Sequence, residues 1–134
     1  MLKKIQIAKP GGYGVLKLVE QAMPEPADDQ VLIEVRACGV NYADGIIRMG
    51  LYASAKELHG YPITPGFELA GVVMRVGNAV TEYRPGDEVL ALTLFGGYCS
   101  HIVLQENRVF RKPANLSFAQ AAALPTVFLT AWFM

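Results

Sequence analysis

The chain has 134 residues, with 12 basic and 12 acidic side chains and 52% hydrophobic residues. A formal net charge of zero argues against a surface built to bind nucleic acid or another polyanion, which needs a basic excess. A chain of this length forms one domain and buries roughly two-thirds of its unfolded surface without disulfide or metal staples. The 13 glycines and 8 prolines imply many turns, so we expect a mainly β fold.

The two cysteines, Cys38 and Cys99, indicate the cellular compartment. Both lie in strand-like or apolar surroundings, and the first residues lack the apolar stretch of a secretory signal. We therefore expect two reduced thiols in a cytoplasmic protein. No window reaches the roughly 18 apolar residues that a membrane span requires, so none is expected.

Short segments of alternating or β-branched residues predict strands along the chain. The first two, 3–8 and 15–20, flank a glycine-rich turn at 9–14. We interpret this turn as a hairpin and not as a dinucleotide-binding loop, because no strand–turn–helix unit follows it. The strongest alternation covers 31–37. Short strands at near-regular spacing with Gly/Pro turns predict a partly closed barrel, and the remaining ones are expected at 67–76, 88–94, 98–103 and 107–111. Gly71 inside the first of these suggests a bulge.

A turn ends the strand at 31–37 and leads into a short predicted helix. This helix is expected over 44–49, with Asn41 or Asp44 as its N-cap. Residues 51–65, which include Tyr52, are predicted as a long loop, and loops of this length in compact domains are often functional.

The C-terminal residues change character. Ser117 and Gln120 have the spacing of a capping box and predict a helix, and Pro125 is well placed to begin a second helix. The apolar side chains of that second helix have little remaining chain to pack against. We therefore expect residues 1–116 to form the main domain and residues 117–134 to form a helical connector, in the front part of a longer protein.

Metal and nucleophile chemistry have weak support in the sequence. No C-x-x-C or H-x-x-x-H spacing occurs, and a catalytic zinc needs three converging ligands, so no metal is expected. Cys99 and His101 share one face of a strand, but no neighbour is placed to orient the imidazole or to activate the thiol. We interpret them as ordinary barrel residues.

A polar group at the end of the strand 31–37 is a better candidate site. It consists of Asn41, Asp44 and Tyr52. An Asn side chain offers a donor and an acceptor, a Tyr phenol can donate, and strand ends that lead into loops often contact ligands. From the residues alone, helix capping and loop packing remain the simpler interpretation.

Seven segments in the correct order resemble the N-terminal, GroES-like domain of the medium-chain dehydrogenase/reductase superfamily, and the resemblance covers residues 5–134. They are A-C-G-V-N-Y-A-D at 37–44, R-x-G-x-Y at 48–52, P-G-x-E-x-x-G-V-V at 65–73, V-G-x-x-V at 76–80, P-G-D-E-V at 85–89, F-G-G-Y at 95–98 and A-A-A-L-P-x-x-x-L-T-A-W at 121–132. Each segment is weak evidence alone, and the ordered set is specific. The resemblance implies a GroES-like barrel whose last helix leads to a Rossmann domain that this chain lacks.

Two positions place the chain within that superfamily. Zinc-dependent alcohol dehydrogenases carry a ligating Cys where this chain has Asn41 and a ligating His where it has Phe67, and the four-Cys structural lobe is also absent. The chain therefore resembles the zinc-free branch, which contains quinone oxidoreductases, vesicle-membrane-protein-type reductases and the enoyl-reductase domains of polyketide synthases. This resemblance implies hydride transfer from NADPH to a quinone or an α,β-unsaturated carbonyl, with no zinc.

The resemblance also implies roles for individual residues. Tyr52 and Asn41 would be catalytic, with the Tyr52 phenol near the acceptor as a hydrogen-bond donor or proton source. Asp44, together with Glu68, also suits a structural role. The residues implied in cofactor binding are Asn41, Tyr42, Asp44, Ile46 and Thr130.

The alternatives at this point are an enoyl-thioester reductase domain of the polyketide-synthase type, a non-enzymatic GroES-like interaction module, and a zinc alcohol dehydrogenase with displaced ligands. Because the dinucleotide-binding domain is missing, we expect residues 1–134 alone to be inactive. The full-length protein is expected to form a homodimer that acts on a small-molecule electrophile.

Overall fold

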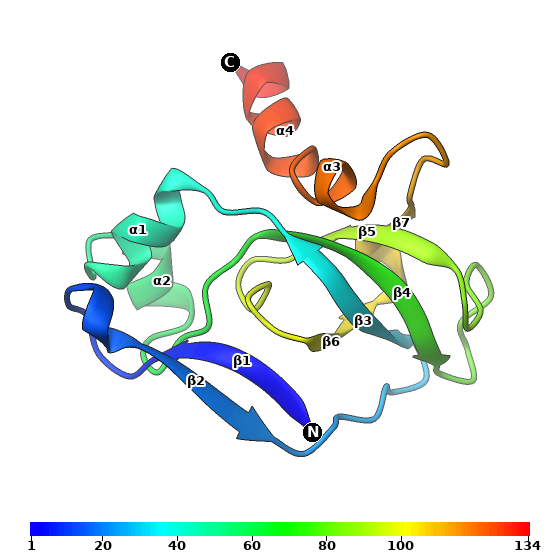
Figure 1. Ribbon diagram of the computed structural model, residues 1–134, viewed down its shortest axis with the longest axis horizontal. Coiled ribbons are helices and arrows are strands. Elements are labelled where there is room, and N and C mark those ends of the chain that lie inside the picture. Colours follow the sequence, from blue (N-terminus) through cyan, green and yellow to red (C-terminus); the bar gives the residue numbers. More distant parts are fainter.

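The computed structural model describes residues 1–134 and is mainly β with short helices, as predicted (Figure 1). The strands are β1 (Leu2–Ile7), β2 (Leu16–Gln21), β3 (Gln30–Cys38), β4 (Glu68–Val76), β5 (Glu88–Leu92), β6 (His101–Gln105) and β7 (Val109–Arg111). The helices are α1 (Tyr42–Arg48), α2 (Ala53–Leu58), α3 (Phe118–Ala122) and α4 (Pro125–Phe133), with 3-10 turns η1 (Tyr13–Val15) and η2 (Glu106–Arg108). None of these helices is long and apolar enough to cross a membrane.

The strands form two antiparallel sheets. The larger sheet has the order β6-β3-β4-β5-β7, and β1 pairs with β2 in the predicted hairpin. Isolated bridges from Lys4 to Cys99 and from Ile7 to Ile63 join the hairpin to loops of the larger sheet. The hairpin therefore runs along one side of that sheet (Figure 1).

The alternation of β3 produces the main core. Val31 and Ile33 are fully buried and pack with Val73 and Val89 from the neighbouring strands. The β3–β4 register shifts near Gly71, where an added Cβ would lie 2.1 Å from the Glu34 carbonyl oxygen. Only glycine permits this close approach, so the irregularity predicted from its position is confirmed.

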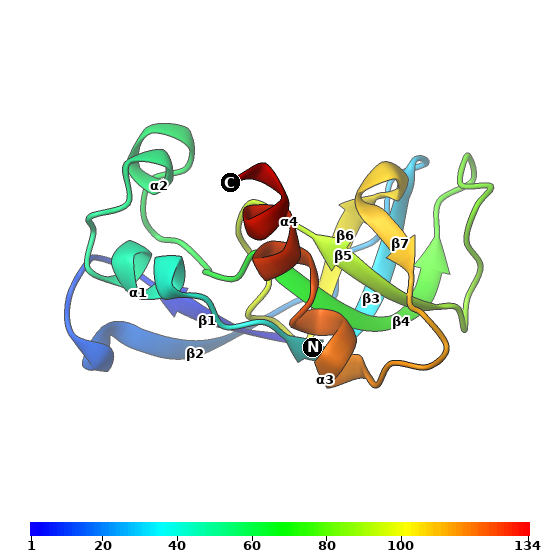
Figure 2. The ribbon, with the colours of Figure 1, turned by 90° about the horizontal axis from the view of Figure 1, so that it is seen from above.

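Two smaller clusters position the helices. Ile47 of α1 and Ala55 of α2 pack with Ile7 and Phe95, so both helices lie at the end of the molecule where the hairpin turns (Figure 2). Helix α3 packs on the large sheet through two buried alanines. Helix α4 then stands between the α1–α2 end and strand β5, and its Trp132 side chain is 84% exposed.

Several elements differ from the sequence prediction; β5 ends at Leu92 and not at residue 94, and β7 begins at Val109 and not at residue 107. Helix α1 begins at Tyr42, two residues early, because Asp44 occupies the third helical position. The predicted loop 51–65 contains α2, whose small Ala55 is buried against the second core. The strand expected at 98–103 begins only at His101, because the Tyr98 and Ser100 N–H groups donate to the Pro65 and Lys3 carbonyls, outside the large sheet.

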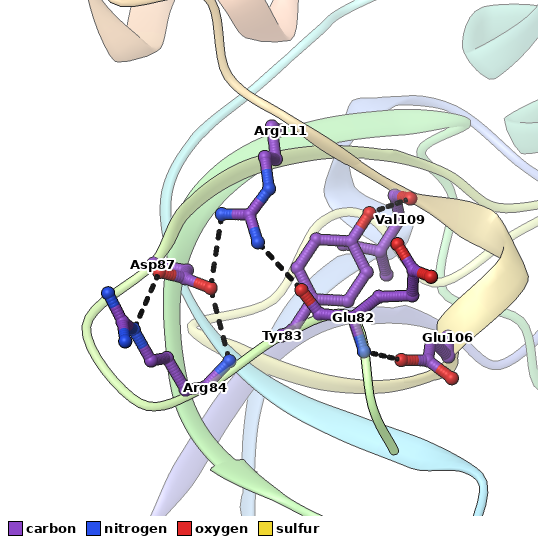
Figure 3. Close-up of polar contacts among 7 residues, drawn as sticks. All are labelled: Glu82, Tyr83, Arg84, Asp87, Glu106, Val109 and Arg111. Carbon is purple, nitrogen blue, oxygen red and sulfur yellow. Dashed lines mark hydrogen bonds and ion pairs between the residues drawn. The ribbon is translucent and has the colours of Figure 1, made fainter.

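The loop between β4 and β5 is fixed to β7 by polar contacts (Figure 3). The Arg111 guanidinium lies 3.3 Å from the Asp87 carboxylate and donates to the Glu82 carbonyl at 2.7 Å. The Tyr83 hydroxyl donates to the Val109 carbonyl at 2.5 Å, and burial raises the pKa of this phenol. These groups satisfy one another, so they stabilise this end of the sheet.

Candidate active site

The turn after β3 holds Asn41 in a defined orientation. Asn41 is the N-cap of α1, with extended backbone angles, and its backbone N–H donates to the Asp44 carboxylate at 2.9 Å. Its side-chain Nδ2 donates to Oε1 of Glu68, also at 2.9 Å. The reciprocal contact of this capping box joins the Asp44 backbone N–H to the Asn41 side chain, which also lines the pocket described below.

Glu68 connects the turn to helix α4. Its side chain is 1% exposed, and its second carboxylate oxygen accepts a 2.7 Å hydrogen bond from the backbone N–H of Thr126, in the first turn of α4. Gly39 makes room for this carboxylate, because a Cβ at that position would lie 2.1 Å from Oε1. One buried carboxylate therefore fixes the Asn41 amide relative to α4.

Asp44 supports the same turn from the other side. One carboxylate oxygen accepts from the Gly66 backbone N–H at 2.9 Å, and the other accepts from the Asn41 N–H and from the Tyr98 hydroxyl. Burial and the neighbouring Asp44 charge raise the pKa of Tyr98, so its phenol stays protonated and continues to donate. The Asp44 carboxylate is therefore occupied by contacts within the protein.

A pocket of about 330 Å³ opens in front of Asn41. We call it the Asn41 pocket. Its walls come from the turn after β3, the start of β4, the end of β5 and helix α4, with Tyr52 from the segment before α2. Its lining residues are Asn41, Ala43, Tyr52, Phe67, Leu92, Thr93, Thr126, Leu129 and Thr130.

Several polar groups of the Asn41 pocket have free hydrogen-bonding capacity. The Tyr52 ring packs edge-on against Phe67, with centroids 6.1 Å apart. Its side chain, whose hydroxyl forms no hydrogen bond within the protein, lines the pocket. The Thr130 hydroxyl donates to the Thr126 carbonyl at 2.7 Å, which leaves its lone pairs to accept. The Thr126 hydroxyl is buried without a partner. A buried polar atom of this kind is normally satisfied, and this one belongs to a residue that lines the pocket.

The structure brings together three of the residues that the sequence nominated. Asn41 and Tyr52 line one pocket with Thr130, which lies far along the chain from both. Tyr42, Asp44 and Ile46 do not line it: Tyr42 is 87% exposed, Asp44 is buried beneath the turn, and Ile46 is half-buried on α1. Sequence reasoning missed Thr126, and the available signal was its position one helical turn before Thr130.

The lining of the Asn41 pocket contains no thiol, imidazole or carboxylate. Nowhere in the chain do three or more His, Cys, Asp or Glu side chains gather as a metal site would require. Phe67 occupies the wall with an aromatic ring that cannot ligate a metal. The chemistry of this pocket is therefore that of amide, hydroxyl and phenol groups.

Both cysteines are free and poorly reactive. Burial, followed by the charges of Asp44 and Glu68, raises the pKa of Cys38. Burial raises the pKa of Cys99 to about 12, and the nearby His101 ring contacts the Ser100 hydroxyl at 3.0 Å. Neither thiol has the lowered pKa of a nucleophile.

The alcohol dehydrogenase GroES-like domain family matches residues 27–130. The chain belongs to this family. The resemblance to the N-terminal domain of the medium-chain dehydrogenase/reductase superfamily is thereby confirmed, together with the GroES-like fold.

Curated relatives extend beyond this domain. The quinone oxidoreductase of Sus scrofa is 40% identical over 133 residues, which are 98% of this chain and 40% of the relative. The human synaptic vesicle membrane protein VAT-1 homolog-like is 35% identical over 99% of this chain and 31% of its own length. The chain thus spans less than half the length of these relatives.

Solved structures show the same fold in the superfamily. The Escherichia coli quinone oxidoreductase complexed with NADPH matches with a TM-score of 0.88 and 34% identity, over 98% of this chain and 39% of that chain. The CurK enoyl reductase matches with a TM-score of 0.91 and 33% identity, over 98% and 41%. These proteins correspond to two of the branches expected from the sequence.

Proposed function

We propose that this chain is the substrate-side domain of an NADPH-dependent, zinc-independent oxidoreductase that reduces quinones or α,β-unsaturated carbonyls. The observation that carries the proposal is the Asn41 pocket, where Asn41, Tyr52 and Thr130 converge from three separate segments. The family and the similarity to quinone oxidoreductases support it.

The free groups of the Asn41 pocket suit the nicotinamide end of the cofactor. A carboxamide has one acceptor and two donor hydrogens. The Thr130 lone pairs are free to accept, and the Thr126 hydroxyl has no partner in the protein, beside the Asn41 amide in the same pocket. NADPH, when bound, supplies the hydride. Because Glu68 already orients the Asn41 side chain, little conformational entropy of this side chain is lost when a ligand binds.

The donor set of the pocket supports a reaction without zinc. Without a metal, hydrogen-bond donors must stabilise the negative charge that develops on the carbonyl oxygen of the substrate when it accepts the hydride. In our proposal, the unpartnered Tyr52 hydroxyl is that donor and a possible source of the proton. The rings and alkyl groups of Phe67 and Leu129 exclude water from the same space.

The other predicted cofactor residues keep more limited roles. We assign Asp44 to positioning, because its carboxylate holds the turn that carries Asn41. Tyr42 and Ile46 lie on α1 and do not line the Asn41 pocket. Their contact with the cofactor stays a prediction.

The proposed activity requires a second domain. We retain residues 1–116 as the substrate-side domain and residues 117–134 as the connector, and we place most of the NADPH site in a dinucleotide-binding domain that follows. The exposed Phe128, Trp132 and Phe133 of α4 form an apolar surface suited to contact with it. The complete protein is proposed to be a cytoplasmic homodimer.

An enoyl-thioester reductase is the second candidate, favoured by the match to the CurK enoyl reductase. A non-enzymatic interaction module is less well supported, because it gives the unpartnered hydroxyl groups of the Asn41 pocket no role. The test is NADPH consumption at 340 nm by the complete protein with a quinone, an enone and an enoyl thioester side by side. Turnover of none of the three acceptors contradicts the proposal.

A further inference from the structure

A second cavity, larger than the Asn41 pocket, lies between the hairpin and the large sheet. It measures about 500 Å³ and shares only Thr93 with the Asn41 pocket. Alternation along β1 points Leu2, Lys4 and Gln6 toward it. The opposite walls are the start of β6, the turn at 93–96 and the residues that follow α2.

Backbone hydrogen bonds fix the walls of this cavity. The Ile5 N–H donates to the Tyr98 carbonyl at 2.9 Å, which joins β1 to the segment before β6. The Gly96 N–H donates to the Thr64 carbonyl at 2.8 Å, which joins the turn to the segment after α2. The cavity is therefore preformed, so a ligand need not order its walls.

The charge of the lining has one sign. Among its 18 residues are two cationic side chains, Lys4 and Arg108, and the imidazoles of His59 and His101, and there is no Asp or Glu. Lys4 and Arg108 form no ion pair in the protein, whereas the adjacent Lys3 points the other way and pairs with Glu20 at 3.5 Å. We call this cavity the basic cleft.

Two carboxylates that are near lining residues in the sequence, those of Glu25 and Glu106, bind partners outside the basic cleft. Glu25, next to a lining proline, pairs with Arg75 at 2.5 Å. Glu106, two residues before Arg108, accepts from the Thr81 and Glu82 backbone N–H groups. No carboxylate therefore lines the cleft itself, where Lys4 and Arg108 are the charged side chains, although the chain as a whole is neutral.

The remaining lining limits the kind of anion that would fit. Apolar surface comes from Leu58, Leu94, Phe95 and Ile102, and the side chain of Gln6 adds amide groups. A bare inorganic ion would leave the apolar surface uncovered. A carboxylate or phosphate carried on a short apolar chain would satisfy both parts of the lining.

We propose that the basic cleft is a binding site for a small organic anion with an apolar body, whose anionic group contacts Lys4 and Arg108. The proposal does not depend on the reductase function, because the site is built from residues outside the Asn41 pocket except for Thr93.

The test is a titration of the isotope-labelled 134-residue chain, followed by amide NMR. The probes are octanoate and octyl phosphate, with octanol as the neutral match and inorganic phosphate as the match without an apolar body. We expect saturable shifts at the amides of residues 93–96 and 101–103 with both alkyl anions. Octanol and inorganic phosphate should bind about tenfold more weakly.

A charge variant tests the contacts themselves. Lys4→Gln combined with Arg108→Gln should weaken binding of the alkyl anions about tenfold, because both unpaired cations are lost. Lys9→Gln combined with Lys17→Gln removes the same charge outside the cleft and should leave affinity within about twofold. The NMR spectra of both variants report directly whether the fold is intact.

Three results would overturn the proposal. The first is the absence of saturable shifts in the cleft with either alkyl anion. The second is equal affinity for octanol and octanoate, which would show an apolar site without anion recognition. The third is equal weakening by the two double variants, which would show a non-specific charge effect. Stronger binding of one alkyl anion identifies whether the natural ligand carries a carboxylate or a phosphate.

Discussion

The Asn41 side-chain amide donates a 2.9 Å hydrogen bond to the carboxylate of Glu68, which is 1% exposed. The same carboxylate accepts from the Thr126 backbone N–H at 2.7 Å. A side-chain donor from a turn and a backbone donor from a helix thus share one buried carboxylate. Replacing the carboxylate with an amide of the same shape therefore tests whether both oxygens are needed as acceptors.

Glu68→Gln should destabilise the chain. A glutamine amide offers one oxygen and one NH₂ where the carboxylate offers two oxygens, so either Asn41 or Thr126 faces a donor instead of an acceptor. We expect a loss of about 1–3 kcal/mol in the free energy of unfolding, measured by urea denaturation. Glu57→Gln removes the same charge from an exposed position on α2 and is the control. Equal stability of the two variants would contradict the bridging role of Glu68.

Gly39→Ala should also destabilise the chain, for a steric reason. The added Cβ would lie 2.1 Å from Glu68 Oε1 and 2.5 Å from its Cγ, so the buried carboxylate must move. We expect a cost of about 1–3 kcal/mol in urea denaturation. Gly12→Ala places the same methyl group in open space and should change stability by less than about 0.5 kcal/mol. A neutral Gly39→Ala would show that Glu68 is not confined at this position.

Tyr52→Phe should slow the complete enzyme if the phenol acts on the acceptor. The aromatic contact with Phe67 is kept, and only the hydroxyl is lost. We expect kcat to fall about 10- to 100-fold with a quinone or enone substrate. Tyr13→Phe removes the hydroxyl of an exposed tyrosine in the turn between β1 and β2, and it should leave kcat unchanged. Unchanged kcat in Tyr52→Phe would assign this side chain to packing alone.

The isolated 134-residue chain should not turn over NADPH. In our proposal it contributes Asn41 and Thr130 to the nicotinamide end, and it contains no glycine-rich turn at a strand–helix junction to hold the diphosphate. The measurement is NADPH oxidation at 340 nm with menadione, with the complete protein as the positive control. Oxidation by the isolated chain at the rate of the complete protein would contradict the proposed division of labour between two domains.

The pKa of Cys99 gives a pH-dependent prediction. Burial raises it from 9.0 to about 12, so at pH 8 this residue has about a thousandfold less thiolate than a free cysteine. Disulfide exchange with Ellman's reagent should therefore be slow in native Cys38→Ser, which retains only this thiol, and rapid after unfolding. Because the folded-state pKa is raised, the stabilisation is complete below pH 9 and is lost as the pH rises through about 12. Rapid native labelling at pH 8 would contradict the burial of Cys99.

Much of the fold was predictable because its strands are regular. The alternation of residues 31–37 and the prolines and glycines between segments indicate strands and turns directly, and the capping box of Ser117 and Gln120 is confirmed by reciprocal hydrogen bonds. Helix α2 was missed because six residues carry little periodic signal. Its position depends on burial of Ala55 against distant residues.

The candidate site was predictable only in part. Asn41 and Tyr52 lie close in sequence, and the ordered motifs add Thr130. The contact of Glu68 with Thr126 joins residues 58 positions apart, and nothing in either segment specifies the other. The burial of Asp44 under the turn likewise depends on Gly66 and Tyr98, which come from later loops. The basic cleft arises from the packing of the hairpin on the sheet, and a neutral net charge gives no hint of it.

The Glu68 bridge has a mechanical consequence. One buried carboxylate accepts from both the Asn41 amide and the first turn of α4, so the positions of these two groups are coupled. A tilt of α4 would change the contact between the Thr126 N–H and the carboxylate that orients the Asn41 amide. We therefore expect that contacts on the exposed apolar end of α4 reach the Asn41 pocket through Glu68.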